Sequence, residues 1–103
     1  MSKISVIAKL TVADGKASEL EAAVAALIAA ADEEPGLEVY SCHAANDEPG
    51  VYYFFEVYSD GDAVKVHGRG EAMKPAMAAL GGVLAGRPEI IAMRPIAAKG
   101  LEL

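Results

Sequence analysis

The stretch from Phe55 to Gly70, FEVYSDGDAVKVHGRG, contains the side chains best suited to chemistry. A strand pattern ends near Tyr58, and a short helical pattern then ends at His67. Imidazole has a reference pKa of about 6.5, so His67 is suited to accepting a proton at neutral pH. Tyr58 offers a ring that can stack on an aromatic ligand and a hydroxyl that can donate a hydrogen bond. The structural alternatives are a helix-end histidine and a core or interface aromatic residue.

Other candidates lie on the second expected strand and on the last helix. Tyr40 and His43 are an odd number of residues apart, so they point to opposite faces of a strand and cannot both line one pocket without a bulge. Tyr40 is the better pocket candidate, and His43 is expected to meet solvent or a partner. Met73 and Met77 could form an adaptable apolar pocket floor, with helix core as the alternative.

Charged and sulfur-containing residues exclude several kinds of site. Glu56 shares a strand face with Tyr58, and a carboxylate there needs a partner, so we expect a structural ion pair with Arg94 or Lys9. The single Cys42 excludes an internal disulfide and a cysteine metal cluster, and is expected to be a buried small hydrophobe. Two histidines on separate elements predict no metal site, and no nucleotide-binding loop is present.

The elements that must position these residues follow from hydrophobic periodicity. A capping box is expected at Ser18–Glu21, where the first helix begins. The predicted elements are a strand at 4–12, a helix with its apolar stripe at 20–31, strands at 37–45 and 51–58, a short helix at 60–67, a helix at 72–84 and a strand at 89–96. The order β-α-β-β-α-β predicts a ferredoxin-like α+β fold with an antiparallel sheet, in a single domain over 1–103.

Composition limits the partners. The 103 residues carry a net charge of −6, and the nine Lys and Arg residues form no stripe, which argues against binding nucleic acid or anionic membranes. No apolar run is long enough to cross a bilayer, and nothing at the N-terminus resembles a signal peptide. The expected location is the cytoplasm.

Both faces of the third strand are apolar, although a sheet covered by helices on one face should be polar on the other. Tyr53, Phe55 and Val57 lie on one side, while Phe54 and Tyr58 lie on the other. We therefore expect a homodimer in which the uncovered sheet face packs against its copy. The alternative is an amphipathic sheet with aromatic outliers.

The chain resembles the antibiotic biosynthesis monooxygenase family of dimeric α+β barrels, including quinol monooxygenases. The matching segments are AKLTVADGKASELEAAV, EEPGLEVYSCH, FFEVYSDGDAVKVHGRG and LAGRPEIIAMRPI. The resemblance implies a cofactor-independent monooxygenase that oxidises a small hydroquinone or polyphenol with O₂, in a pocket between sheet and helices. A site that stabilises the phenolate and excludes water would supply most of the catalysis. The alternative from another class is a non-catalytic small-molecule binding module.

The resemblance also assigns residues. His67 matches the family's histidine in the short helix, and Tyr58 stands where many members have tryptophan, so these two are the expected catalytic residues. Phe54 takes the place of an asparagine of the polyketide monooxygenases; the expected substrate contacts are Tyr40, Phe54, Met73 and Met77. In the haem-degrading branch an asparagine, a tryptophan and an axial histidine occupy the positions of Ala8, His67 and Met77. The axial ligand is missing from its expected place, which disfavours haem, and no cofactor is expected.

Overall fold

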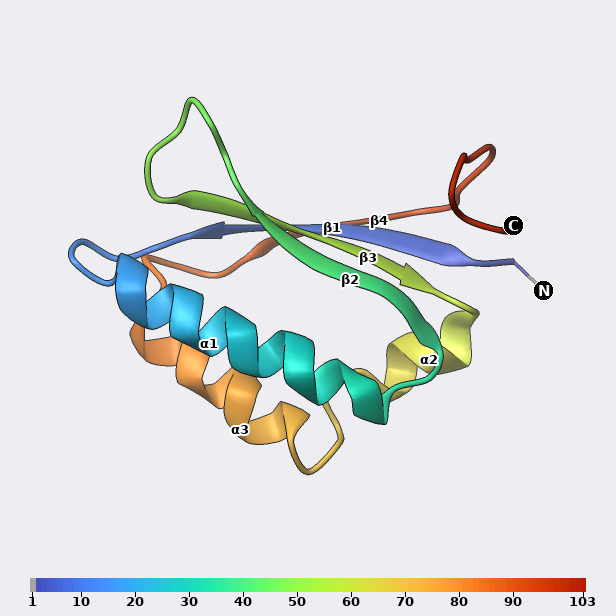
Figure 1. Ribbon diagram of the computed structural model, residues 1–103, viewed down its shortest axis with the longest axis horizontal. Coiled ribbons are helices and arrows are strands. Elements are labelled where there is room, and N and C mark those ends of the chain that lie inside the picture. Colours follow the sequence, from blue (N-terminus) through green and yellow to red (C-terminus); the bar gives the residue numbers. More distant parts are fainter. Residues whose placement is uncertain (1) are drawn as a thin grey trace.

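A four-stranded antiparallel sheet carries all of the helices on one face (Figure 1). The computed structural model describes residues 2–103. Its elements are β1 (Ile4–Thr11), α1 (Ala17–Ala30), the 3₁₀ turn η1 (Ala31–Glu33), β2 (Leu37–Ala44), β3 (Val51–Tyr58), α2 (Gly61–Val66), α3 (Met73–Ala78), η2 (Ala79–Gly82) and β4 (Glu89–Met93). The predicted ferredoxin-like α+β order is confirmed, with α2 as the short additional helix.

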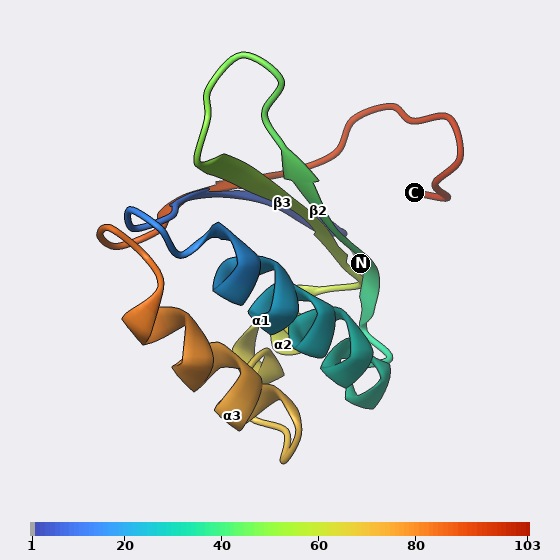
Figure 2. The same ribbon diagram turned by 60° about the vertical axis from the view of Figure 1, so that its left-hand side comes forward.

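The sheet order β2-β3-β1-β4 places strand β3, which carries Phe54, Glu56 and Tyr58, at an interior position. Ile7 of β1 lies opposite Phe55 of β3 on one side and opposite Ile91 of β4 on the other. Because side chains alternate along a strand, these three residues share the face away from the helices. Phe54 and Tyr58 therefore point toward the helices, where both are buried. Figure 2 shows the helices gathered on this one side of the sheet.

The core lies between the sheet and helices α1 and α3. Its buried members are Ala8, Leu10, Leu27, Ala30, Phe54, Met73 and Ala76. Helix α1 buries Leu20 and Leu27 as its stripe predicts, but Ile28, expected in the same stripe, is 38% exposed at the edge. The helix therefore packs on the face centred on Leu20, Ala23 and Leu27.

The capping box expected from Ser18 is wrong. Helix α1 begins at Ala17, its N-cap is Lys16, and no side chain caps it. Ser18 is thus the second helical residue, two positions after the N-cap, which is too late for its hydroxyl to act as the cap. Lys16 instead pairs with Glu19, with Nζ and Oε2 3.1 Å apart.

Two elements end earlier in the structure than the sequence predicted. Helix α3 starts at Met73 with Pro75 in its first turn, as expected, but regular helix stops at Ala78 and 3₁₀ structure at Gly82, short of Leu84. Gly81 and Gly82 favour this early end because glycine is a weak helix former. Strand β4 stops at Met93 and not at Ile96, because Pro95 has no N–H for the sheet ladder.

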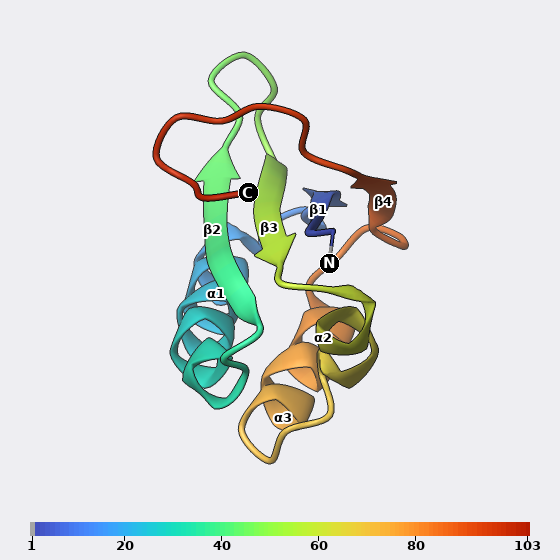
Figure 3. The ribbon, with the colours of Figure 1, turned by 90° about the vertical axis from the view of Figure 1, so that its right-hand side faces the viewer.

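The sheet face away from the helices, here called the free face, exposes large apolar side chains. Val39, Phe55, Ile91 and Met93 are all exposed there. The segment after β4 runs across this side of the sheet toward β2 (Figure 3). Among residues 2–103, none of the helices combines the length and the apolarity that crossing a bilayer requires.

Candidate active site

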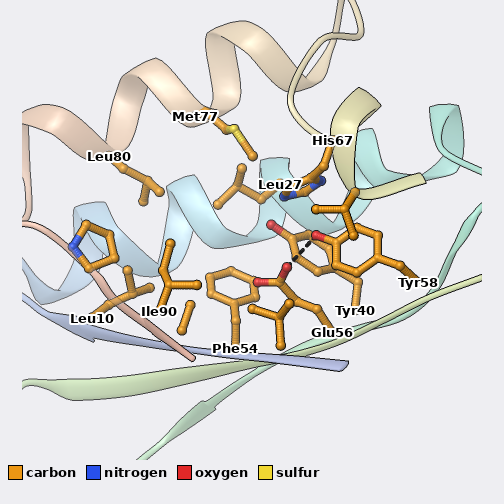
Figure 4. Close-up of a pocket in the computed structure, with 14 residues that line it drawn as sticks. Leu10, Leu27, Tyr40, Phe54, Glu56, Tyr58, His67, Met77, Leu80 and Ile90 are labelled. Atoms are coloured by element: carbon orange, nitrogen blue, oxygen red, sulfur yellow. Dashed lines mark hydrogen bonds between the residues drawn. The ribbon is translucent and has the colours of Figure 1, made fainter. Parts of the chain in front are cut away.

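A cavity of about 330 Å³ lies between the sheet and the helices (Figure 4). None of the described residues that line it is a lysine or an arginine. They are Val6, Ala8, Leu10, Leu27, Tyr40, Phe54, Glu56, Tyr58, Val64, His67, Met77, Leu80, Pro88 and Ile90. An apolar cavity with a few convergent polar groups is the typical form of a small-molecule site.

The polar groups gather at one end of the cavity. His67, Tyr40, Tyr58 and Glu56 lie together at one end, while Leu10, Leu80 and Ile90 lie at the other (Figure 4). The ring of His67 is 5.6 Å from the ring of Tyr40 and 5.6 Å from that of Tyr58, centroid to centroid, with an edge toward each. A ligand that fills the cavity therefore meets hydrogen-bonding groups at one end only.

His67 is held by a buried carboxylate. Its Nδ1 lies 2.8 Å from Oε1 of Glu34, and the backbone N–H of Gly68 donates to Oε2 of Glu34 at 3.0 Å. Because Glu34 accepts both bonds, Nδ1 of His67 carries the hydrogen, and the neutral ring keeps its lone pair on Nε2. A histidine with its tautomer set in this way is ready to accept a proton from a bound ligand.

The chain geometry at Gly68 makes this contact possible. Helix α2 is capped by Asp60, whose Oδ1 accepts from the N–H of Ala63 at 2.9 Å, and it ends at Val66. Gly68 then adopts a φ of +84°, in the left-handed region that favours glycine. A Cβ at this position would lie 2.8 Å from Sδ of Met77, so glycine also permits the close packing of α3.

Glu34 is the candidate site residue that the sequence analysis missed. It stands 33 residues before His67, just beyond η1, and no spacing rule joins the two positions. Its side chain is nevertheless buried. An acidic residue directly before a Pro-Gly turn was visible in the sequence, but nothing in the pattern indicated that it would turn inward.

Glu56 and Tyr58 form a second buried pair. The hydroxyl of Tyr58 donates to Oε1 of Glu56 at 2.5 Å. Burial raises the pKa of Glu56 above its usual value, although the Tyr58 hydrogen bond and the nearby His67 oppose this shift. The expected ion pair of Glu56 with Arg94 or Lys9 is wrong, because Glu56 points toward the helices and Lys9 lies on the opposite face, 4.0 Å from Glu89.

Replacing Glu56 with glutamine should change how stability depends on pH. A carboxyl pKa raised on folding means that the native state binds more protons, so wild-type stability falls as pH rises from the unfolded pKa, about 4.5, to the native pKa. The Glu56→Gln variant lacks this loss but retains an oxygen that can accept from Tyr58. Thermal unfolding from pH 4 to pH 8 should show the variant gaining stability relative to wild type as pH rises. A constant difference would contradict this prediction.

The sequence profile of the antibiotic biosynthesis monooxygenase family matches residues 3–79. The chain belongs to this family. None of the curated proteins matches it in sequence.

Solved structures agree with this membership. A candidate antibiotic biosynthesis monooxygenase from Caulobacter crescentus CB15 is 37% identical, with a TM-score of 0.86, over 93% of this chain and 92% of that one. PA3566 from Pseudomonas aeruginosa is 25% identical with a TM-score of 0.83, over 94% and 97%. SnoaB, a cofactor-independent oxygenase from Streptomyces nogalater, shares the fold at 19% identity and a TM-score of 0.82, over 98% and 100%. The family and the Caulobacter structure support monooxygenase chemistry in general terms.

In this family member the cavity brings together most of the predicted site residues. Tyr58, His67, Tyr40, Phe54 and Met77 all line it. The rings of Tyr40 and Phe54 are stacked, with centroids 4.8 Å apart and planes inclined by 21°. Burial, followed by the charges of Glu56 and Glu34, raises the pKa of Tyr40, which keeps its hydroxyl protonated.

Three candidates lie outside the cavity lining. Met73 is fully buried in the core and does not line the cavity, so the core alternative is correct for it. His43 lies on the free face, where its ring is 4.7 Å from that of Phe55. Cys42 is half-buried, less than expected, beside a separate hollow. Within residues 2–103 no group of three His, Cys, Asp or Glu side chains is arranged to hold a metal ion.

Proposed function

We propose that this protein is a cofactor-independent monooxygenase that oxidises a small hydroquinone or polyphenol with O₂. The observation that carries the proposal is the His67–Glu34 pair at the polar end of an otherwise apolar cavity. Such a pair supplies a base beside a space that holds an aromatic ring and little water. Both features favour the reaction of a phenol with O₂, because the phenolate is a far better electron donor than the phenol.

In the proposed reaction, Nε2 of His67 accepts the phenolic proton and Glu34 stabilises the resulting imidazolium. The phenolate transfers an electron to O₂, and the two radicals combine at a ring carbon to form a hydroperoxide. Loss of water converts that carbon to a carbonyl. One oxygen atom enters the product, a hydroxyquinone, and the other leaves as water with two hydrogens from the substrate, which supplies all of the electrons.

In the proposed site, Tyr58 positions Glu56 with its hydroxyl and forms part of the cavity wall with its ring. Its single hydroxyl hydrogen is directed to Oε1 of Glu56, so direct donation to a phenolate requires that bond to break. Tyr58 thus positions Glu56 in the ground state, and its ring forms part of the cavity wall beside His67. Phe54 and Tyr40 offer stacked faces against which a substrate ring can lie.

We also propose that the protein is a homodimer joined through the free face. Phe55 is 46% exposed and Ile91 is 59% exposed on neighbouring parts of this face. Apolar surface removed from water contributes about 25 cal/mol per Å², so packing this face against its copy is favourable. The helices and the cavity lie on the other side of the sheet, so this arrangement leaves each cavity free.

Oxygen uptake with a panel of substituted hydroquinones tests the enzymatic proposal. Uptake should require protein, and ¹⁸O₂ should place one labelled atom in the product. The matched control is the dimethyl ether of each hydroquinone, which has the same ring but no proton for His67 to remove. Ligand binding under anaerobic conditions is measured in parallel. Binding of the hydroquinones without oxygen uptake would support the alternative of a non-catalytic binding module.

A further inference from the structure

We propose that Glu56 restricts the cavity to uncharged phenols, which bind with a hydroxyl at the Glu56–His67 end and an apolar substituent at the Leu10–Leu80–Ile90 end. This inference rests on the proposed function, since it specifies the substrate class of the same cavity. Aromatic acids, which carry a carboxylate on the same ring, are excluded. Glu56 is therefore a specificity-determining residue.

The free oxygen of Glu56 is the first observation. Its Oε1 accepts from Tyr58, whereas Oε2 has no side-chain hydrogen-bond partner within residues 2–103. No side-chain oxygen or nitrogen of the described residues is both fully buried and unpaired, so Oε2 retains access to the cavity that Glu56 lines. A ligand hydroxyl can donate to this oxygen, whereas a ligand carboxylate has no hydrogen to offer.

The balance of charge in the cavity is the second observation. The titratable groups at its polar end are Glu56, Tyr40, Tyr58 and His67, with Glu34 behind His67. No lysine or arginine lines the cavity among the described residues, and a protonated His67 is already balanced by Glu34. A carboxylate at the Glu56–His67 end would lose its water and face Glu56 without a compensating cation. A carboxylate at the opposite end would lose its water among side chains that offer no hydrogen-bond donor, which is also unfavourable.

The apolar end of the cavity is the third observation. Leu10, Leu80 and Ile90 come from β1, η2 and β4, and they enclose the space farthest from His67 (Figure 4). Ile90 lies on the edge strand β4, and its side chain is 67% exposed. An alkyl or ester substituent fits here, and a hydroxyl placed at this end would find no hydrogen-bond partner among these three side chains.

Anaerobic binding of one matched pair of ligands tests the inference. The pair is methyl 2,5-dihydroxybenzoate and 2,5-dihydroxybenzoate, which share the hydroquinone ring and differ by the ester and the ionised carboxylate. At pH 7 the wild-type protein should bind the ester at least about tenfold more tightly than the acid. The Glu56→Gln variant keeps an acceptor for Tyr58 and removes the charge, so this ratio should fall toward one. Glu89→Gln, the same change of net charge on the free face, should leave the ratio as in wild type.

The results test the specificity role of Glu56 separately from the oxygenase proposal. Equal wild-type affinity for the two ligands, a ratio unchanged by Glu56→Gln, or an equal fall in Glu89→Gln would each overturn the role of Glu56. Failure of the ester to bind wild-type protein at millimolar concentration would also overturn it. Selective binding of the ester without oxygen uptake would retain the specificity and reject the oxygenase. Equal oxygen uptake with the acid and with the ester would support the oxygenase and reject the specificity assigned to Glu56.

Discussion

Replacing His67 with alanine is expected to lower kcat/KM for hydroquinone-dependent oxygen uptake by about 10²–10⁴-fold, the usual contribution of a positioned base. The variant loses the one imidazole that lines the cavity among the described residues. It also leaves the buried Glu34 without its Nδ1–H donor, so thermal unfolding must be measured to confirm that the variant is folded. The measurement is initial oxygen uptake over a range of substrate concentrations.

His43→Ala is the matched control, because it removes the other histidine of the chain from the opposite face of the sheet. It should keep wild-type oxygen uptake. Glu34→Gln provides an intermediate case: the amide oxygen still accepts from Nδ1 of His67, but the charge that stabilises the imidazolium is gone. Its oxygen uptake should lie between those of wild type and His67→Ala. Equal rates for wild type and folded His67→Ala would reject the base mechanism.

Replacing Phe55 with glutamate is expected to convert a dimer into a monomer. The substitution places a charge at the centre of the free face, where a partner copy would have to bury it without a counter-ion. Light scattering at micromolar concentration should give a two-copy mass for wild type and a one-copy mass for the variant. The expected change is complete dissociation at this concentration.

Val66→Glu serves as the control for this experiment. Val66 is 50% exposed at the end of α2, on the helical side of the molecule, so a charge there adds the same −1 without touching the free face. Its mass should equal that of wild type. A one-copy mass for the wild-type protein itself would reject the homodimer.

The sequence alone determined which side chains share a face of each strand. The period of two along β3 places Phe54, Glu56 and Tyr58 together, and the odd spacing of Tyr40 and His43 separates them; the structure confirms both. The element order could also be read, because breaks at Pro and Gly residues separate segments with clear helical or strand periods. These properties depend on neighbours in the chain, so local patterns report them well.

The ends of the elements were predicted less well, because they depend on tertiary packing as well as on the local sequence. The capping box failed because helix α1 begins one residue before Ser18, and helix starts depend on tertiary packing as well as on capping residues. Met73 and Met77 were indistinguishable by periodicity, yet one is fully buried in the core and the other lines the cavity. The difference depends on how α3 sits against α1 and the sheet, which no spacing along α3 reports.

Only the tertiary structure decided which polar groups meet. It joined Glu34 to His67 across 33 residues of sequence, and it gave Glu56 a tyrosine partner where a cation was expected. A sequence period relates residues within one element, whereas contacts between elements depend on the packing of the helices against the sheet. The alternation along the chain therefore specified which side chains share each face of the sheet. The packing of α1, α2 and α3 against one of those faces formed a cavity with the His67 imidazole at one end.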